Sequence, residues 1–305
     1  CCIFSLQAVA ASSDSNTTDS NVLSVDNNVS AYTLPNSDSD TLKEVANADS
    51  FADLQGKVNG VSEVTLDKNY TYKSTDTISN GIIINHNIVI QANGNVIIDA
   101  DHKSRIFKIT NGATVTLKGI TFINGDTTSD SDVKQGGAIL VTAGTKVNVD
   151  NCNFINNTAY YGMGGAICIA GLQGSTINNS YFEGNKAINK PGTENTGGAG
   201  AVFINANRTT ISNSEFIKNS AGLNGGAVGS SANKINYCTI DGCNFTSNTA
   251  NGSAGGVGMQ SSNFYIYDST FKYNEAKGSY KENPTYPGNG GGLVMRGWDS
   301  YAYNC

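Results

Sequence analysis

A motif that recurs six times between residues 117 and 276 constrains the fold of this chain more than any other feature. The motif reads Phe-x-x-Asn-x-Ala, and successive copies are 32, 28, 34, 29 and 26 residues apart. Its phenylalanines are Phe122, Phe154, Phe182, Phe216, Phe245 and Phe271. Its asparagines are Asn157, Asn185, Asn219, Asn248 and Asn274, with Gly125 in the first copy. Repeats of this length indicate a solenoid in which each copy forms one turn.

Two further columns of similar residues precede each phenylalanine. Ser or Cys stands two positions earlier in every copy but the first, and Leu, Val or Ile stands five positions earlier. Runs of β-branched residues indicate that each turn is a coil of β-strands. Equivalent strands of stacked coils then pair in parallel and in register, about 4.8 Å apart. We therefore predict an all-β fold, a single-stranded, right-handed parallel β-helix.

Stacking in register gives each column a role. The Phe and aliphatic columns form the core, and the Ala column lies where only a methyl group fits beneath the next coil. The Asn column is predicted to form a ladder, with left-handed backbone and with amide hydrogen bonds between coils. Sharp corners are predicted at six Gly-Gly pairs. These pairs begin at Gly136, Gly164, Gly197, Gly225, Gly255 and Gly290.

The N-terminal third of the chain contains other kinds of sequence. Residues 1–12 are predicted to be the remnant of a truncated signal peptide, because a short apolar run ends in Ala8-Val9-Ala10. Residues 13–45, mostly Ser, Asp, Asn and Thr, are predicted to be a disordered spacer. We predict that the β-helix spans residues 46–305 and is cut off at its C-terminus.

A short amphipathic helix is predicted to cap the start of the β-helix. Phe51, Leu54 and Val58 recur at helical spacing. Ser50 precedes them as a candidate N-cap, and Asp53 places a carboxylate in the first turn.

These patterns resemble two groups of surface proteins. Phe-x-x-Asn-x-Ala together with Gly-Gly-Ala-Ile resembles the repeat of chlamydial polymorphic outer-membrane proteins. The N-terminal coils are similar to adhesin-like surface proteins of methanogenic archaea, in the runs 51–55, 64–67, 69–72, 104–107 and 115–118. The resemblance covers roughly residues 50–305. It implies a secreted or cell-surface β-helix that mediates attachment, in a family whose members usually carry further domains or an anchor.

The charge of the chain argues against a nucleic-acid partner. It has 19 Lys and Arg against 25 Asp and Glu, a net charge of −6, whereas nucleic acid requires clustered positive charge. No run reaches the roughly 18 apolar residues of a membrane-spanning helix. We expect a monomer without a cofactor.

The seven cysteines show no metal-binding motif. Cys152 and Cys243 occupy the small-residue column three coils apart, so we interpret them as buried thiols. Cys238 and Cys243 flank a predicted corner, and whether they form a disulfide is left open.

A polysaccharide-active lyase or glycoside hydrolase is the main alternative, because such enzymes also use β-helices. Their sites need neighbouring carboxylates or a bound Ca²⁺, and the strands after the Gly-Gly pairs carry no acidic residue. The densest polar candidate, interpreted as a solvated turn, is Asp99, Asp101, His102 and Arg105. A second acidic group, interpreted as a flexible loop and not a Ca²⁺ site, is Asp126, Asp130 and Asp132. We expect no catalytic, cofactor-binding or metal-binding residues.

Length variation in the repeat predicts where a ligand would bind. The segment between each Phe-x-x-Asn-x-Ala motif and the next Gly-Gly pair varies in length, whereas the rest of the repeat is nearly constant. Insertions therefore stack on one edge, at loops 126–135, 188–196 and 276–289. Tyr combines a flat apolar ring with a polar tip. The candidate ligand-contact residues on this edge are Tyr160, Tyr161, Tyr280 and Tyr286.

The sequence thus favours a non-catalytic, exported or cell-surface, adhesin-like protein that attaches to surface glycans, to cells or to partner proteins. Two alternatives are kept. A carboxylate cluster on adjacent coils would favour the polysaccharide-active enzyme. Adhesion that survives removal of the edge loops would favour a purely structural stalk.

Overall fold

The computed structural model describes residues 47–305 apart from 132, 172–173, 191–197, 231–234 and 279–288. By its internal contacts the chain divides into two units, residues 1–38 and 39–305, and the described residues belong to the second. The predicted signal-peptide remnant (1–12) and spacer (13–45) lie outside the described residues.

Three parallel sheets form the faces of the molecule. The large, 15-stranded sheet contains β1 (Glu63–Leu66), β2 (Tyr70–Thr71), β4 (Ile88–Asp99), β6 (Thr114–Ile123), β8 (Lys146–Asp150), β9 (Asn153–Ile155), β12 (Thr176–Asn178), β13 (Tyr181–Glu183), β16 (Thr210–Ser212), β17 (Glu215–Ile217), β20 (Thr239–Asp241), β21 (Asn244–Thr246), β24 (Tyr265–Tyr267), β25 (Thr270–Lys272) and β28 (Tyr301–Tyr303). The 8-stranded sheet contains β3 (Ile82–Ile84), β5 (Phe107–Ile109), β7 (Ile139–Val141), β11 (Ile167–Ile169), β15 (Val202–Ile204), β19 (Val228–Ser230), β23 (Val257–Met259) and β27 (Leu293–Met295). The 5-stranded sheet contains β10 (Thr158–Tyr160), β14 (Lys186–Ile188), β18 (Ser220–Ala221), β22 (Thr249–Ala250) and β26 (Glu275–Ala276).

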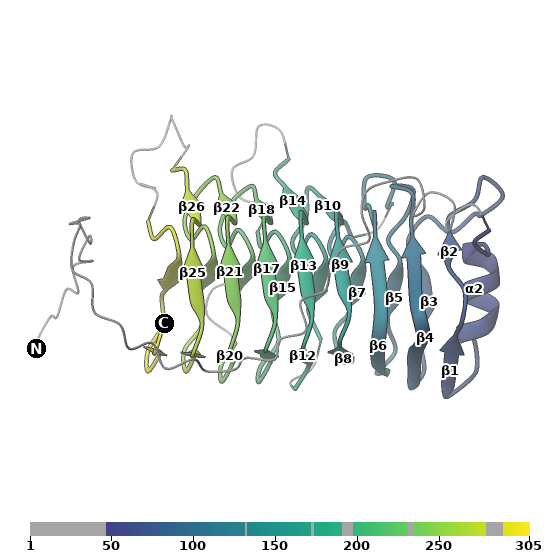
Figure 1. Ribbon diagram of the computed structural model, residues 1–305, viewed down its shortest axis with the longest axis horizontal. Helices are drawn as coiled ribbons and strands as arrows, with labels where there is room; N and C mark the ends of the chain where they lie inside the picture. Colours follow the sequence, from purple (N-terminus) through teal and green to yellow (C-terminus); the bar gives the residue numbers. More distant parts are fainter. Residues whose placement is uncertain (1–46, 132, 172–173, 191–197, 231–234, 279–288) are drawn as a thin grey trace, which may run out of the picture. The chain divides into compact units, whose positions relative to one another are not determined.

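The strands wind into a β-solenoid of about seven turns, which confirms the predicted fold (Figure 1). In Figure 1 the chain rises through the strands of the large sheet, crosses the upper edge at the 5-stranded sheet and returns behind. With each such turn the chain advances toward the left of the picture, away from the N-terminal coil. This combination of rotation and advance makes the solenoid right-handed. From β8 to β25 each turn contributes two strands to the large sheet, and most turns add one strand to each of the other two sheets.

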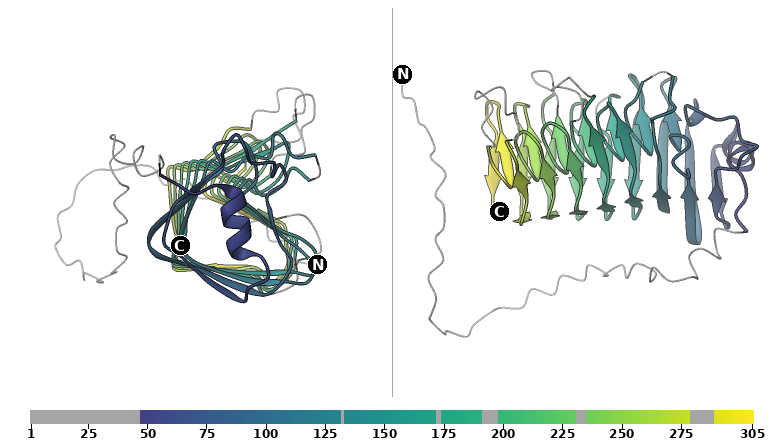
Figure 2. Two further views of the ribbon diagram at one scale, coloured as in Figure 1. Left: turned by 90° about the vertical axis from the view of Figure 1, so that its right-hand side faces the viewer. Right: turned by 90° about the horizontal axis from the view of Figure 1, so that it is seen from above.

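Helix α2 (Phe51–Val58) closes the N-terminal end of the solenoid, as predicted (Figure 2). The Ser50 hydroxyl accepts a hydrogen bond from the Asp53 N–H at 3.1 Å, and the Asp53 carboxylate accepts one from the Ser50 N–H at 2.9 Å. A cap of this kind contributes about 1 kcal/mol. The apolar side chains of Phe51, Leu54 and Val58 are buried, so the helix shields the first coil from water.

The Phe column forms a continuous aromatic stack through the core. From Phe122 to Phe271 the ring centroids of successive coils are 4.7–5.0 Å apart, and their planes differ by 14° at most. The first five rings are fully buried. The aliphatic column is buried beside them and the Ala column pairs in register. The predicted core columns are confirmed.

The Asn column forms the predicted amide ladder. The Asn185 side-chain amide donates to Asn219 Oδ1 and to the Phe154 carbonyl, both at 2.9 Å, and the other coils repeat this pattern. The prediction of left-handed backbone at these asparagines is wrong, because the positive φ belongs to the preceding residue, as at Lys218 and Ser247. That residue makes the bend, and the asparagine can then direct its amide inward.

The corners before the 8-stranded sheet are shifted from the predicted pairs in two coils. In register with the strands, they are Gly136-Gly137, Gly164-Gly165, Ala199-Gly200, Gly225-Gly226, Ala254-Gly255 and Gly290-Gly291. The pair predicted at Gly255 is thus one residue out of register, and the pair predicted at Gly197 begins outside the described residues. Ala199 and Ala254 adopt positive φ themselves. The second corner residue is the more constrained, since a Cβ on Gly200 would lie 2.1 Å from a carbonyl oxygen of the next coil.

Candidate functional site

Two of the four predicted ligand-contact tyrosines lie together on the variable edge. The Tyr161 hydroxyl donates to the Tyr160 hydroxyl at 2.9 Å, and the two ring centroids are 4.0 Å apart. This hydrogen bond raises the pKa of Tyr161. Lys134 Nζ lies 5.9 Å from the centroid of the Tyr160 ring. The other two candidates, Tyr280 and Tyr286, lie outside the described residues.

The interpretation of Arg105 as part of a solvated turn is wrong. Its guanidinium is fully buried and forms an ion pair with the buried Asp130 carboxylate at 2.5 Å. It also donates to the carbonyls of Gly136 and Asn80, at 3.0 and 2.9 Å. Because Asp130 is held in this way, its assignment to a flexible loop is wrong as well. Backbone carbonyls of the corner satisfy the guanidinium, which explains how it is buried.

The remaining polar candidates divide between exposed and half-buried positions. Asp101 and His102 are exposed, as expected for a solvated turn. Asp99 accepts hydrogen bonds from the Asp101 N–H and the Asn124 amide, at 2.8 and 2.9 Å, and burial raises its pKa. Asp126 caps a local turn by accepting from the Thr128 N–H at 2.6 Å. Asp132 lies outside the described residues.

The described cysteines are free thiols, and no disulfide joins Cys238 to Cys243. Both are buried, as is Cys152. Burial raises the pKa of Cys152 and of Cys243 to about 12, so neither thiol is reactive at neutral pH. The Cys152 N–H donates to Ser180 Oγ at 3.2 Å, which confirms that the small-residue column is structural.

Four tyrosines form an outward-facing array at the C-terminal coils, which we call the tyrosine array. Tyr265 and Tyr267 of β24 pair in register with Tyr301 and Tyr303 of β28. The rings of Tyr265 and Tyr301 are 6.1 Å apart and nearly parallel. Ile266 between the first pair is fully buried, so its tyrosine neighbours point outward. The alternation Tyr-Ile-Tyr and Tyr-Ala-Tyr in the sequence is the signal that could have revealed this array.

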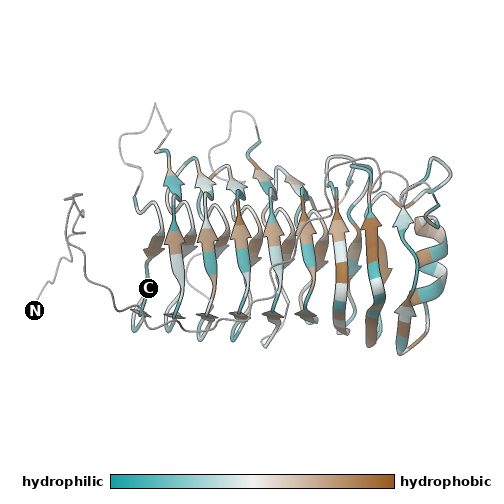
Figure 3. Ribbon diagram, in the orientation of Figure 1, coloured by the Kyte–Doolittle hydropathy of each residue, from teal (hydrophilic) through white to brown (hydrophobic). Residues whose placement is uncertain are grey.

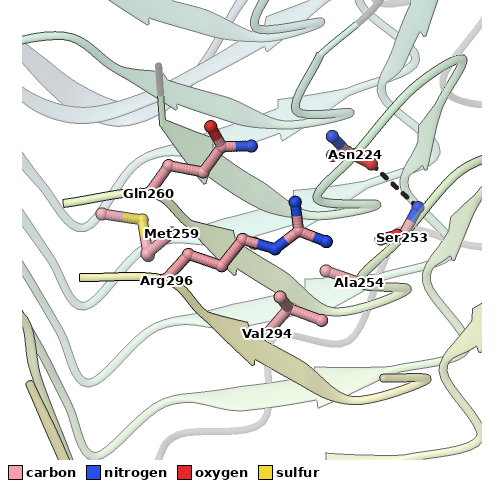
Figure 4. Close-up of a pocket in the computed structure, with 8 residues that line it drawn as sticks. Asn224, Ser253, Ala254, Met259, Gln260, Val294 and Arg296 are labelled. Carbon is pink, nitrogen blue, oxygen red and sulfur yellow. Dashed lines mark hydrogen bonds between the residues drawn. The ribbon is translucent and has the colours of Figure 1, made fainter. Parts of the chain in front are cut away.

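A second feature is a depression on the outer face of the 8-stranded sheet (Figure 4). The middle residues of its strands point outward, and in three successive strands Leu140, Cys168 and Phe203 pack together in a small apolar cluster. In the next two strands this position holds Gly229 and Gly258. The depression beside them is shallow and partly open to solvent. This glycine pocket is lined by Asn224, Ser253, Ala254, Gly258, Met259, Gln260, Val294 and Arg296.

Hydrogen-bond donors gather at the glycine pocket. The Arg296 side chain extends across it with its guanidinium toward Asn224 and Ser253 (Figure 4). Asn224 Oδ1 accepts from the Ser253 N–H at 2.8 Å, which leaves the Asn224 NH₂ group available. Among the residues that the structure describes, the guanidinium of Arg296 and the amide of Gln260 have no side-chain partner. The sequence search passed over this site because it sought acidic residues.

A pair of carboxylates lies on the outer face of the large sheet. Glu183 ends β13 and Glu215 begins β17 on the adjacent coil. Tyr181 Oη donates to Glu183 Oε2 at 2.8 Å. Burial raises the pKa of Glu215, and the charge of Glu183 raises it further. Sequence reasoning missed this pair because it examined only the strands that follow the Gly-Gly corners.

Two classes of site find no support in the described part of the chain. It contains no group of three or more His, Cys, Asp or Glu placed to hold a metal ion. None of its helices is long and apolar enough to cross a membrane.

Comparison with known proteins yields no relative. No family model, no curated protein and no solved structure matches this chain. The function is therefore inferred from the surface of the solenoid.

Proposed function

We propose that this protein is a non-catalytic, exported or cell-surface, adhesin-like β-solenoid that attaches to glycans. The observation that carries the proposal is the tyrosine array, in which two coils present four rings in register to solvent. Ile266 between Tyr265 and Tyr267 is fully buried, so the tyrosine columns of β24 and β28 lie on the solvent side of the sheet. An aromatic ring packs against the apolar face of a sugar, and its hydroxyl can bond the hydroxyls at the sugar's edge.

The regular spacing of the coils also suits a polymeric ligand. Successive coils place equivalent side chains about 4.8 Å apart, so a linear glycan can contact the same residue type on several coils. Each contact is modest, and many copies on a surface supply useful avidity. The signal-like N-terminus and the resemblance to adhesin-like surface proteins support an exported location.

Glycan-array binding of the whole chain tests this proposal. We expect the double variant Tyr301→Ala, Tyr303→Ala to lose most glycan binding, because it removes the two most exposed rings of the array. Tyr273→Ala is the matched control, since this tyrosine is 85% exposed and lies outside the array. Unchanged binding by the double variant, with the fold intact by circular dichroism, would contradict the proposal and favour a structural stalk.

One observation favours a polysaccharide-active enzyme as the second candidate. Glu183 and Glu215 lie on adjacent coils, and the raised pKa of Glu215 suits a general acid. This candidate ranks second because the glycine pocket lies on another sheet, away from the two carboxylates. Release of reducing ends from polysaccharides by the wild type, abolished in Glu215→Gln, would establish it.

A further inference from the structure

We propose that the glycine pocket binds the carboxylate of an acidic sugar, with Arg296 as the anion-binding residue. The inference rests on the proposed function for the glycan itself, and it deepens that function by naming the class of sugar. Shape, hydrogen bonding and charge support it separately.

The shape of the pocket follows from two glycines in one column. Gly229 and Gly258 are neighbours in register, with Phe203 before them and Val294 after them in the same column. Neither glycine has a side chain, and the corners partly fill the space above them, since a Cβ on Gly229 would lie 3.3 Å from the Ala199 Cβ. The depression is shallow, so it can receive the carboxylate group of a sugar whose ring lies outside it. A Cβ on Gly258 would lie 3.0 Å from the Ala254 Cβ, which shows how closely the corner approaches the floor.

The polar groups at the pocket are all suited to donate. A guanidinium presents a planar fork of N–H groups that matches the two oxygens of a carboxylate. The NH₂ groups of Asn224 and Gln260 add two further donors beside Arg296. Val294 and Ala254 supply apolar surface, on which the C–H face of a sugar can pack.

Charge singles out Arg296 among the three arginines of the chain. Arg105 is already paired with Asp130, and the guanidinium of Arg208 lies 5.9 Å from the centroid of the Tyr237 ring. No acidic residue lines the glycine pocket. In a chain of net charge −6, this combination creates a local site for an anion.

Isothermal titration calorimetry with two matched sugars tests the inference. The probes are cellotriose and its counterpart in which each C6 alcohol is oxidised to a carboxylate, titrated at low ionic strength. We expect the wild type to prefer the acidic trisaccharide by about tenfold, the scale of one charge-assisted hydrogen-bond pair. Arg296→Gln should bind both sugars alike, with unchanged affinity for the neutral one. Lys118→Gln is the matched control, since it removes one exposed positive charge from the large sheet. It should keep the preference for the acidic trisaccharide.

A second variant protects the test against misfolding. Gln260→Glu changes one group without altering side-chain length and places a negative charge in the pocket, so it should abolish the preference for the acidic sugar. A preference that persists in Arg296→Gln overturns the inference. Equal binding of the two sugars by the wild type overturns it too, while leaving the proposed glycan binding in place. Binding of neither sugar counts against both.

Discussion

The coils before residue 124 and those after it build the large sheet from strands of different length. In the early coils, single long strands run through the bend that separates two strands in the later coils: β4 has 12 residues and β6 has 10, and β6 pairs with both β8 and β9. In the later coils the large sheet is built from pairs of short strands, such as β12 and β13 with 3 residues each. Figure 3 shows the early strands as largely apolar ribbons, whereas the later coils mix apolar and polar segments.

What replaces strand continuity in the later coils is hydrogen bonding by side chains. Between β12 and β13 the chain bends at Asn179, which has positive φ, and Ser180 N donates to the hydroxyl of Ser214 at 3.1 Å. The amide ladder begins where the two regions meet, since the Gly125 N–H donates to Asn157 Oδ1 at 2.8 Å. The comparison teaches that the same bend is made in two ways: by a glycine of positive φ within the strand, as at Gly119 of β6, and by a positive-φ residue followed by a hydrogen-bonded Ser or Cys in the later coils.

The largest expected effect is at the junction of the two regions, in Phe154→Ala. The Phe154 ring stacks between those of Phe122 and Phe182, so its removal leaves a cavity that rigid neighbours cannot fill. We expect a loss of about 3–5 kcal/mol in the free energy of unfolding, measured by urea denaturation. The exposed control Tyr273→Ala should change it by less than about 0.5 kcal/mol. Equal midpoints for the two variants would show that the stack is not part of the core.

A smaller effect is expected from breaking the amide ladder at Asn219→Ala. This change removes the acceptor for the Asn185 N–H and NH₂, and the donor to the Phe182 carbonyl and Asn248 Oδ1. Buried partners left unsatisfied should cost about 2–3 kcal/mol. Asn274→Ala, at the last rung and only half-buried, should cost less in the same urea titration. If both cost the same, the ladder does not stabilise the later coils through its interior rungs.

The smallest expected effect concerns the pH dependence introduced by Glu215. Its pKa is raised in the folded state, so the folded protein binds its proton more tightly than the unfolded chain does. Stability is therefore lost as pH rises through that pKa. Glu215→Gln should be more stable than the wild type at pH 7, by less than about 1 kcal/mol because the group is partly exposed. The difference should vanish below the ordinary glutamate pKa, and a constant difference at all pH values would contradict this account.

The columns of the sequence predicted most of the fold because a solenoid turns sequence period into spatial contact. Phe182 and Phe216 are adjacent in space for the same reason that they are equivalent in sequence. Contacts between residues that are not equivalent in the repeat could not be predicted from its period. The ion pair of Arg105 with Asp130 joins a corner to a loop of variable length. One corner was predicted at the pair that begins at Gly197 but lies at Ala199-Gly200. The prediction required glycine at the first corner position, whereas Ala199 adopts the positive φ there.

The candidate sites were less predictable for a related reason. The tyrosine array and the glycine pocket depend on which side chains point outward on neighbouring coils. The alternation of Tyr with Ile or Ala indicates the outward side chains of each strand in the array, whereas variable loop lengths hide which strands are neighbours. Tyr160 and Tyr161 were predicted because they directly follow a Phe-x-x-Asn-x-Ala motif, on the edge where the repeat varies in length. The Gly229 and Gly258 positions became recognisable only once β19 and β23 were paired in register.

The parallel pairing of every strand also determines how the molecule resists force. Hydrogen bonds between coils run along the solenoid axis, while the strands run across it. Tension along the axis loads the few bonds of one coil at a time, so coils peel away singly and extend the tether. Tension along the strands of a face must instead shear all bonds between two coils together. A ligand on an outer face that pulls along the strands therefore meets the stiffer direction of the molecule.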